Sequence, residues 1–461
     1  MGQPNSYAMK AWFQKLLNIV KEDVLLKRVL RNTSYLFSSQ AIGMVLAMGQ
    51  SVLATHLLGA SLFGLLAVVM TFATNVNRLF SFRMGEFVIQ FMGKELVKKD
   101  TLKAAAVAKA ALLTESITSV LTYGVFLLVI PIGTNLFAKN PTTSSLFQVY
   151  GLFILANLCN ESATGILQIT NRYKIQAAIN LTQSIVTAGL IGVAFLMHGS
   201  ILFVLWAYLI GKFIIGLGSV IAALIALHQK LGRDWWKAPF SIFPSIKEMA
   251  AFTVSTNLSG TIKMLVSGSE PLLIGFLLDT QAVALYKIAT SITEPLMIPI
   301  SQFINTTFPE MTRSIVQRKW QELRTLLRRV TIISGVWTLL FTLGMLVLGP
   351  WILSIWGQKY VAAYPTMMIL LVGYGISNIF YWNRTLLLSF GKANIPLYVL
   401  FAGAVIKTAL AFVVVPPFGM AAEAWLLSGN FAITVGLMVA IGYSLIRKNE
   451  RLDQQKAEAA A

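Results

Sequence analysis

The sequence predicts an all-α polytopic membrane protein with about 12 transmembrane helices, in two six-helix bundles related by a parallel repeat. The first observation is composition: 56% of the 461 residues are apolar and 12% are charged, whereas a soluble domain carries about 25% charged residues. The second is a series of apolar segments of bilayer length, and the third is the concentration of lysine and arginine in alternate loops. The segments are apolar on every side, which disfavours barrel strands.

The predicted helices follow these apolar segments in order. They are 34–56, 62–92, 104–130, 146–168, 178–197, 200–228, 248–278, 282–311, 330–355, 365–390, 397–416 and 421–446. Several exceed the roughly 20 residues that a bilayer requires, so tilt or extension into water is expected. For the long segment 62–92, a break of the helix near Arg78 is the alternative.

These helices divide the chain into five predicted parts. They are a basic amphipathic segment at 1–33, an N-terminal bundle at 34–228, a linker at 229–247, a C-terminal bundle at 248–446 and a tail at 447–461. Within the first part, Trp12 to Leu30 is expected to lie along the membrane surface as a helix.

Basic residues in alternate loops predict the orientation. The N-terminal segment, the C-terminal tail and the loops after even-numbered spans carry nearly all of them, while the opposite loops contain only Lys139 and Lys359. The positive-inside rule therefore places both termini in the cytoplasm. The net charge of +19 is mostly this topological signal, reinforced by attraction to anionic membrane lipid. It does not indicate nucleic-acid binding.

The two halves of the chain show a repeat at an offset of 220 residues. Leu57-Leu58-Gly59 matches Leu277-Leu278-Asp279 at the turn after the first span of each half. Ile166-Leu167 followed by Asn171-Arg172 matches Leu386-Leu387 followed by Gly391-Lys392. A parallel repeat of this kind is typical of alternating-access transporters, which bind their substrate between the two bundles.

Thirteen ionisable residues fall inside the predicted spans. The basic ones are Arg78, Arg83, Lys109, Lys212, Lys263, Lys287, Arg384 and Lys407, and the acidic ones are Glu86, Glu115, Glu161, Glu270 and Glu294. A charge at mid-membrane costs about 2.5–3.5 kcal/mol on insertion scales, so these side chains should face a polar interior. Because the basic residues are in excess, the sequence predicts a cationic cavity for an anionic substrate, especially one that bears phosphates.

Lys212, Lys263 and Lys407 are the deepest predicted cations. Lys263 lies about 22 Å along its helix at 1.5 Å per residue, and Glu270 follows seven residues later on the same face. Pro271 removes a helix hydrogen bond directly after Glu270. An acid beside a helix break is a candidate proton or cation site, and the alternative is a buried Lys263–Glu270 pair that only locks two helices.

Arg83 and Glu86 share a helix face at the spacing i, i+3. One interpretation is a structural or gating ion pair between them. The other is that Arg83 binds phosphate through the donors that the pair leaves unused. Arg384 is a further candidate for substrate binding, with snorkelling to the cytoplasmic interface as the alternative.

A family resemblance lies in His56-Leu-Leu-Gly-Ala-Ser-Leu-Phe-Gly-Leu-Leu-Ala67 and Leu79-Phe-Ser-Phe-Arg-Met-Gly-Glu86. The Leu-Leu-Gly turn and the Phe82-Arg83-x-x-Glu86 pattern resemble the polysaccharide-exporter (Wzx-like) branch of the multidrug/oligosaccharidyl-lipid/polysaccharide superfamily. Gly165 to Tyr173 and Leu386 to Pro396 resemble the ends of the fourth and tenth helices of that family. The resemblance covers residues 29–446.

The resemblance implies a flippase for polyprenyl-pyrophosphate-linked oligosaccharides in the bacterial inner membrane, with polysaccharide polymerase machinery as a partner. The positions that fit its cationic cavity are Arg78, Arg83, Lys212, Lys263 and Lys407. No cofactor is implied, and coupling to a proton or sodium gradient through Glu270 is a hypothesis.

Four alternatives remain open. A multidrug or cation exporter of the same superfamily would need an acidic, aromatic-lined cavity. A flippase for a peptidoglycan precursor belongs to the same class and has the same composition. A membrane enzyme acting on lipid-linked sugars would need an outer-loop acid or histidine, for which Asp279 and Glu423 are the main candidates. The three histidines are scattered and indicate no metal site or catalytic triad, so a transporter is favoured over an enzyme. A purely structural membrane protein is the fourth alternative.

Overall fold

A computed structural model of the chain describes residues 24–81, 83–239, 261, 268–392 and 394–460. These residues contain helices and turns without any strand, so the prediction of an all-α polytopic membrane protein is confirmed. Helices suit lipid because each satisfies its own backbone hydrogen bonds. The surface segment predicted at Trp12 to Leu30 lies mostly outside the described residues, as does most of the span predicted at 248–278.

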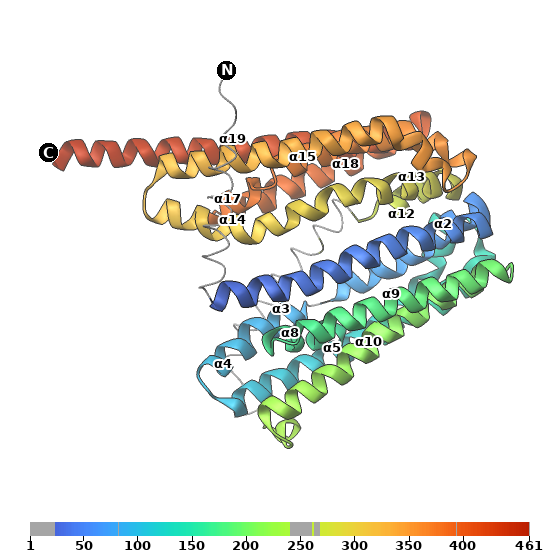
Figure 1. The fold of residues 1–461 in the computed structure, drawn as a ribbon. Helices are drawn as coiled ribbons and strands as arrows, with labels where there is room; N and C mark the ends of the chain where they lie inside the picture. Colours follow the sequence, from blue (N-terminus) through green and yellow to red (C-terminus); the bar gives the residue numbers. More distant parts are fainter. Residues whose placement is uncertain (1–23, 82, 240–260, 262–267, 393, 461) are drawn as a thin grey trace, which may run out of the picture.

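The first half of the chain forms one bundle, and the second half forms another beside it (Figure 1). The elements of the first bundle are α2 (Val24–Phe80), α3 (Met84–Phe87), the π-helix η1 (Val88–Met92), α4 (Gly93–Val97), α5 (Thr101–Ile132), η2 (Gly133–Phe137), η3 (Pro141–Thr143), α6 (Ser144–Gly151), α7 (Phe153–Ala156), α8 (Asn160–Ile169), α9 (Tyr173–Leu196), α10 (Ile201–Leu231) and η4 (Trp235–Lys237). Those of the second are α12 (Glu270–Leu277), α13 (Thr280–Thr293), η6 (Glu294–Met297), α14 (Ile298–Val316), α15 (Trp320–Ser354), η7 (Gln358–Ala363), α16 (Tyr364–Ile379), α17 (Asn383–Ser389), α18 (Asn394–Phe418) and α19 (Met420–Ala460).

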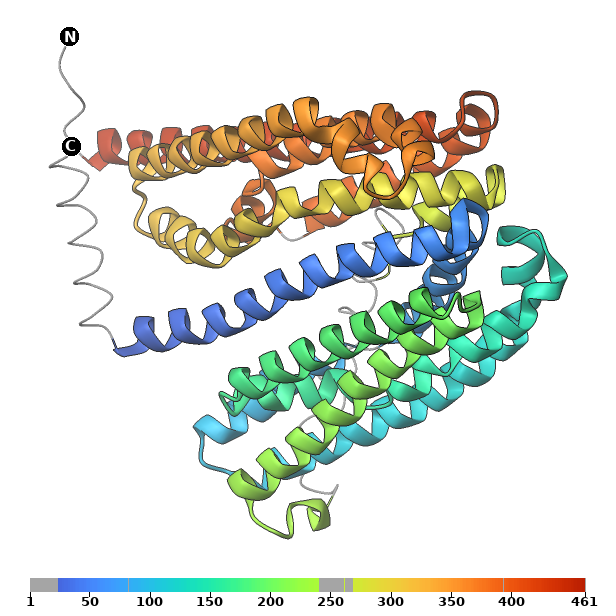
Figure 2. The same cartoon turned by 45° about the vertical axis from the view of Figure 1, so that its right-hand side comes forward.

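Nine helical segments of the described part are long and apolar enough to cross a membrane. The first, Ser38–Leu96, has 59 residues and includes two predicted spans, because the chain turns back at Gly59 (φ 72°, ψ 174°; Figure 2). The span predicted at 62–92 is broken close to Arg78, because α2 ends at Phe80 and α3 begins at Met84. Arg83 has a left-handed backbone (φ 50°) that a right-handed helix cannot accommodate.

Corresponding positions of the two halves have similar backbone features. Asn171 and Gly391, which lie 220 residues apart, both follow a helix end with a left-handed backbone (φ 57° and 71°). Gly59 turns the chain in the first half, and its counterpart Asp279 caps α13 by accepting a hydrogen bond from the Ala282 N–H at 2.7 Å. The turns chosen from the sequence are therefore helix boundaries in both halves.

The two bundles pack tightly where α2 turns back against α12 and α13. A Cβ atom added to Gly64 would lie 1.6 Å from the Thr280 carbonyl oxygen, so only glycine permits this approach. Nearby, the Ser61 and Thr280 hydroxyls lie 3.3 Å apart, and Lys139 donates a hydrogen bond to the Leu278 carbonyl at 2.5 Å. We call this contact region the closed end of the molecule.

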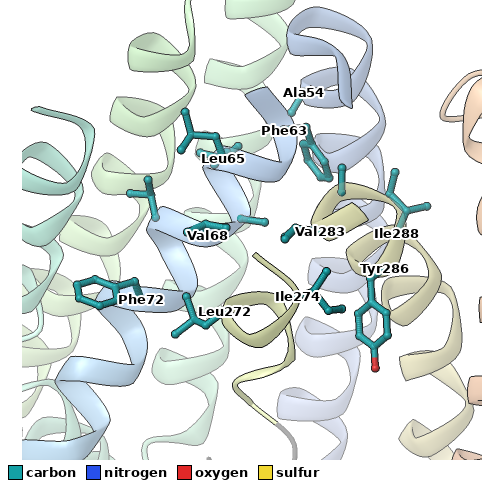
Figure 3. Packing of buried hydrophobic residues seen from close by; sticks show 14 of the residues in the cluster. Ala54, Phe63, Leu65, Val68, Phe72, Leu272, Ile274, Val283, Tyr286 and Ile288 are labelled. Carbon is teal, nitrogen blue, oxygen red and sulfur yellow. The ribbon is translucent and has the colours of Figure 1, made fainter. Parts of the chain in front are cut away.

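Apolar packing extends the closed end toward the middle of the molecule. Phe63 and Val68 of α2 lie in one buried cluster with Ile274 of α12 and with Val283 and Ile288 of α13 (Figure 3). Within a bilayer such contacts are stabilised by close van der Waals packing, because lipid chains are as apolar as these side chains. This cluster therefore joins the two bundles across their interface.

The bundles separate toward the opposite end, where α2 begins and α19 ends (Figures 1 and 2); we call it the open end. There α19 continues as a helix to Ala460, within the tail predicted at 447–461. Arg318 lies 2.7 Å from Asp453, and Arg324 lies 2.5 Å from Glu450. These pairs hold the end of α19 beside the start of α15, within the second bundle.

Gly64→Ala should weaken the closed end, because overpacking of this kind costs about 1–3 kcal/mol. We expect lower cross-linking between cysteines introduced at Ser61 and Thr280, measured in membranes with Cys159→Ala as background. Gly124→Ala in α5 is the matched control, since a Cβ atom there meets no atom within 4 Å. Equal cross-linking in all three proteins would contradict the assignment of Gly64 to a tight contact.

Candidate functional site

A cavity of about 500 Å³ lies between the two bundles, on the inner side of the closed end. Its lining comes from α2 and Tyr208 of α10 in the first bundle, and from α12, α13, η6, α16 and Leu427 of α19 in the second. Asn75 and Arg78 of α2 face it together with Glu270, Lys287 and Glu294 of the second bundle. Because both bundles contribute to its walls, a relative movement of the bundles would change access to this central cavity.

A second, polar pocket of about 280 Å³ lies inside the first bundle. Residues of α2, α5, α8 and α10 line it, among them Lys212 and Asn160. Thr74 and Arg78 line both this side pocket and the central cavity, so the two adjoin. The structure thereby brings together Arg78 and Lys212, two cations that the sequence predicts for substrate binding.

The acids of the side pocket make local hydrogen bonds. The carboxylate of Glu115 on α5 accepts the backbone N–H groups of Glu161 and Ser162, each at 2.8 Å, and so caps the start of α8. Glu161 in turn accepts a hydrogen bond from the Ser81 hydroxyl at 2.6 Å. The acids thus have structural partners within the first bundle.

Arg78 and Lys212, in contrast, form no ion pair with any residue in the described part of the chain. Lys212 is half-buried, and Arg78 is exposed at the boundary of the two cavities. Guanidinium and ammonium groups in such a position can donate charge-assisted hydrogen bonds to an anion, which are about twice as strong as neutral ones.

Arg83 and Glu86 form the ion pair predicted from their spacing, with Arg83 Nη1 2.7 Å from Glu86 Oε1. Arg83 precedes the first residue of α3, and both side chains are exposed at 39% and 50%, outside the residues that line the two cavities. Arg384 is also exposed, on α17, and lines neither cavity. The structure therefore does not gather these residues with Arg78 and Lys212.

Lys407 lies in a buried charge cluster of the second bundle. Its Nζ atom is 3.4 Å from Glu270 Oε1 and 2.6 Å from Glu423 Oε1, and 4% of the residue is exposed. Glu423, a candidate outer-loop acid in the sequence, is instead fully buried in the first turn of α19. Lys263 lies outside the described residues, so the predicted Lys263–Glu270 pair is not described; Glu270 pairs with Lys407.

Lys287, Asn75 and Glu423 are among the lining and cluster residues missing from the set predicted from the sequence. Lys287 is one of the intramembrane bases, but nothing in its local sequence assigns it to the cavity. Asn75 carries no charge and gives no signal in an apolar segment. Glu423 lies beside a predicted loop, and only the packing of α18 against α19 brings it to Lys407.

Comparisons with known proteins agree with this architecture. The family model described as polysaccharide biosynthesis protein matches residues 29–315, and the MatE model matches residues 271–413. The chain is 21% identical over 377 residues to the inner membrane protein YghQ of Escherichia coli (strain K12), an alignment that covers 78% of this chain and 98% of that protein.

Solved transporters have the same fold. An inward-facing multidrug-resistance MATE family transporter of the MOP superfamily has a TM-score of 0.70 at 13% identity, covering 89% of this chain and 96% of that one. The corresponding outward-facing structure has a TM-score of 0.60 at 13% identity, covering 92% and 96%. A MOP superfamily transporter from Pyrococcus furiosus, described as having a binding pocket of reverse polarity, has a TM-score of 0.62 at 12% identity, covering 92% and 96%.

The identities to solved structures are low, so these likenesses support the fold alone. The family model, in contrast, spans more than half of the chain. The protein therefore belongs to the polysaccharide biosynthesis protein family.

Proposed function

We propose that the protein is an alternating-access flippase that moves a polyprenyl-pyrophosphate-linked oligosaccharide from the cytoplasmic to the outer leaflet. The observation that carries this proposal is the pair of cations, Arg78 and Lys212, in a polar pocket that adjoins the central cavity. The family match over residues 29–315 supports a substrate from polysaccharide biosynthesis.

In this mechanism, the pyrophosphate binds to Arg78 and Lys212, because phosphate oxygens accept several charge-assisted hydrogen bonds at once. The sugars occupy the central cavity, where Asn75 and Lys287 offer further donors. The polyprenyl tail stays in the bilayer, whose hydrocarbon solvates it without help from the protein. Arg83, Lys263 and Arg384 remain predicted binding residues, and the Arg83–Glu86 pair is a candidate gate after the end of α2. Lys407, the other predicted binding residue, is already paired with Glu270 and Glu423.

Rocking of the two bundles completes the transport cycle. The arrangement described here, packed at the closed end and separated at the open end, corresponds to access from the open end. The reverse arrangement requires the Gly64–Thr280 contact to break and the open end to close. Coupling of this change to an ion gradient through Glu270 belongs to the same proposal.

The proposed location is the bacterial inner membrane, with both termini in the cytoplasm. The distribution of basic residues supports this orientation, and the similar protein YghQ is named as an inner membrane protein. The proposed partners of the present protein are the lipid-linked substrate, membrane lipid and polysaccharide polymerase machinery. No enzymatic activity is proposed.

A cation exporter is the second candidate, because the MatE model matches residues 271–413 and Glu294 lines the central cavity. Such a protein would use the cavity acids for binding and would not require Lys212. The two candidates therefore differ in which cavity charges matter and in the charge of the transported molecule.

Arg78→Gln and Lys212→Gln should each lower flipping of a fluorescent polyprenyl-pyrophosphate oligosaccharide in reconstituted vesicles roughly tenfold, the equivalent of about 1.4 kcal/mol. Each substitution removes a charged donor to the pyrophosphate while leaving the capped α8 intact. Lys230→Gln, at the exposed end of α10, is the control and should flip at the native rate.

Two outcomes would contradict the flippase proposal. In one, both glutamine variants move the lipid at the native rate. In the other, the native protein moves no such lipid but exports an organic cation, in which case the cation-exporter candidate takes its place.

A further inference from the structure

Three helices of the second bundle contribute one charged side chain each to a single buried cluster. Glu270 comes from α12, Lys407 from α18 and Glu423 from α19. Their exposed fractions are 7%, 4% and 0%, and the ammonium lies between the two carboxylates. Neither cavity cation, Arg78 nor Lys287, forms an ion pair with these acids in the described structure.

The charges of this cluster do not balance. Two carboxylates and one ammonium leave one negative charge when all three groups are ionised. A net charge is costly in a bilayer interior because water is absent and the local dielectric constant is low. Both acids lie in the first turn of their helices, which lowers that cost but does not remove it. The remaining negative charge of the cluster therefore favours binding of one more cation.

The geometry indicates which cation it accepts and where. Lys407 already occupies the position between the acids that a metal ion would need. Glu423 makes the closer contact with the ammonium, at 2.6 Å, and lines neither described cavity. Glu270 makes the longer contact, at 3.4 Å, and lines the central cavity, where water can reach it.

We propose that Glu270, Lys407 and Glu423 form a proton-exchange site, in which Lys407 is a permanent counter-ion and Glu270 takes up and releases the proton. One O–H bond forms on a Glu270 oxygen with a proton from water in the cavity, and the cluster becomes neutral. Proton exchange at this site does not depend on the flippase function proposed above. Only the use of the proton to drive lipid transport rests on that function.

Other titratable groups face Glu270 across the same cavity. They are Arg78 from α2, Tyr208 from α10, Tyr286 and Lys287 from α13, Glu294 from η6 and Tyr374 from α16. Two of these groups are bases, and another, Glu294, is an acid. The hydroxyl of Tyr286 is buried and has no hydrogen-bond partner among the described residues. Proton exchange at Glu270 thus occurs in a polar setting that also senses the charge of the cavity.

Asn75 connects this site to the first bundle. Its amide donates hydrogen bonds to the Gly268 carbonyl at 3.2 Å and to the Ser269 hydroxyl at 3.4 Å, directly before Glu270. A change in the charge of Glu270 alters its contact with Lys407 and hence the position of the start of α12. Asn75 is therefore a positioning residue, through which protonation reaches the interface between the bundles.

The protonation itself can be measured without any substrate. Infrared difference spectra of the purified full-length protein between low and high pH should contain a protonated-carboxyl band that Glu270→Gln removes. Glu294→Gln, which changes an acid of the same cavity, should keep that band. A band that persists in Glu270→Gln, or one that only Glu294→Gln removes, would overturn the assignment while leaving the flippase proposal untouched.

The role of Lys407 is tested with sodium chloride against choline chloride. The native protein should show the same melting temperature in both salts, because its resident ammonium excludes a metal ion. Lys407→Gln should become more stable in sodium, since two carboxylates then lack their cation. Glu423→Gln is the second variant, in case Lys407→Gln does not fold. It should remove the net negative charge of the cluster and, with it, the protonated-carboxyl infrared band. Sodium-dependent stabilisation of the native protein would contradict the proposal.

The connection through Asn75 is tested by transport in vesicles with an imposed pH gradient. Asn75→Leu should keep the Glu270 infrared band but lose the dependence of lipid flipping on the gradient. Glu270→Gln should lose both. Gradient dependence that survives in either variant would overturn the proposed use of the proton, and loss of the band in Asn75→Leu would show that Asn75 only supports the fold of the site.

Discussion

The low dielectric constant of the bilayer is the constraint on which the rest of this structure depends. A charged side chain within a spanning segment must have a counter-ion, a set of polar partners or a wet cavity. Each of these solutions occurs here. Glu115 accepts two backbone N–H groups, Lys407 lies between two carboxylates, and Arg78 faces a cavity without an ion-pair partner in the described structure. The residues left to interact with a substrate are those that structural contacts do not occupy.

The closed end and the charge cluster are parts of one arrangement. The same short helix, α12, packs against Val68 of the first bundle through Gly275 and carries Glu270 in its first turn. Asn75 bonds to the residues directly before it. Movement of α12 therefore changes the packing between the bundles, the lining of the central cavity and the environment of the charges at the same time. This shared element gives a physical basis for coupling between charge and access.

Much of the fold could be predicted from the sequence, because the bilayer imposes length and polarity on each segment. The turn at Gly59 and the paired turns at Asn171 and Gly391 follow from residues that permit a left-handed backbone. Interruptions within helices were harder to predict. The break at Arg83 uses a residue with no preference for that conformation, and η6 at Glu294–Met297 depends on Pro295 inside an otherwise helical segment.

The candidate site could be predicted only in part. An intramembrane charge is visible in the sequence, so Arg78, Lys212, Glu270 and Lys407 could all be selected. Their partners are not visible, because helical spacing relates only neighbours in sequence, whereas Lys407 meets Glu270 across 137 residues. The carboxylate of Glu115 likewise accepts a hydrogen bond from the start of α8, 46 residues away. Counting charges therefore indicates a polar interior but does not separate the cations that a substrate can reach from those already paired.

In the proposed function, the two bundles rock about the central cavity when the lipid-linked substrate binds and moves. Spin-label distance measurements test it most directly, with cysteine pairs at Thr142 and Gln358 near the closed end and at Lys230 and Gln321 near the open end, in a Cys159→Ala background. Adding a polyprenyl-pyrophosphate oligosaccharide should lengthen the first distance and shorten the second. Distances that do not change, or that change in the same direction at both ends, would contradict the account.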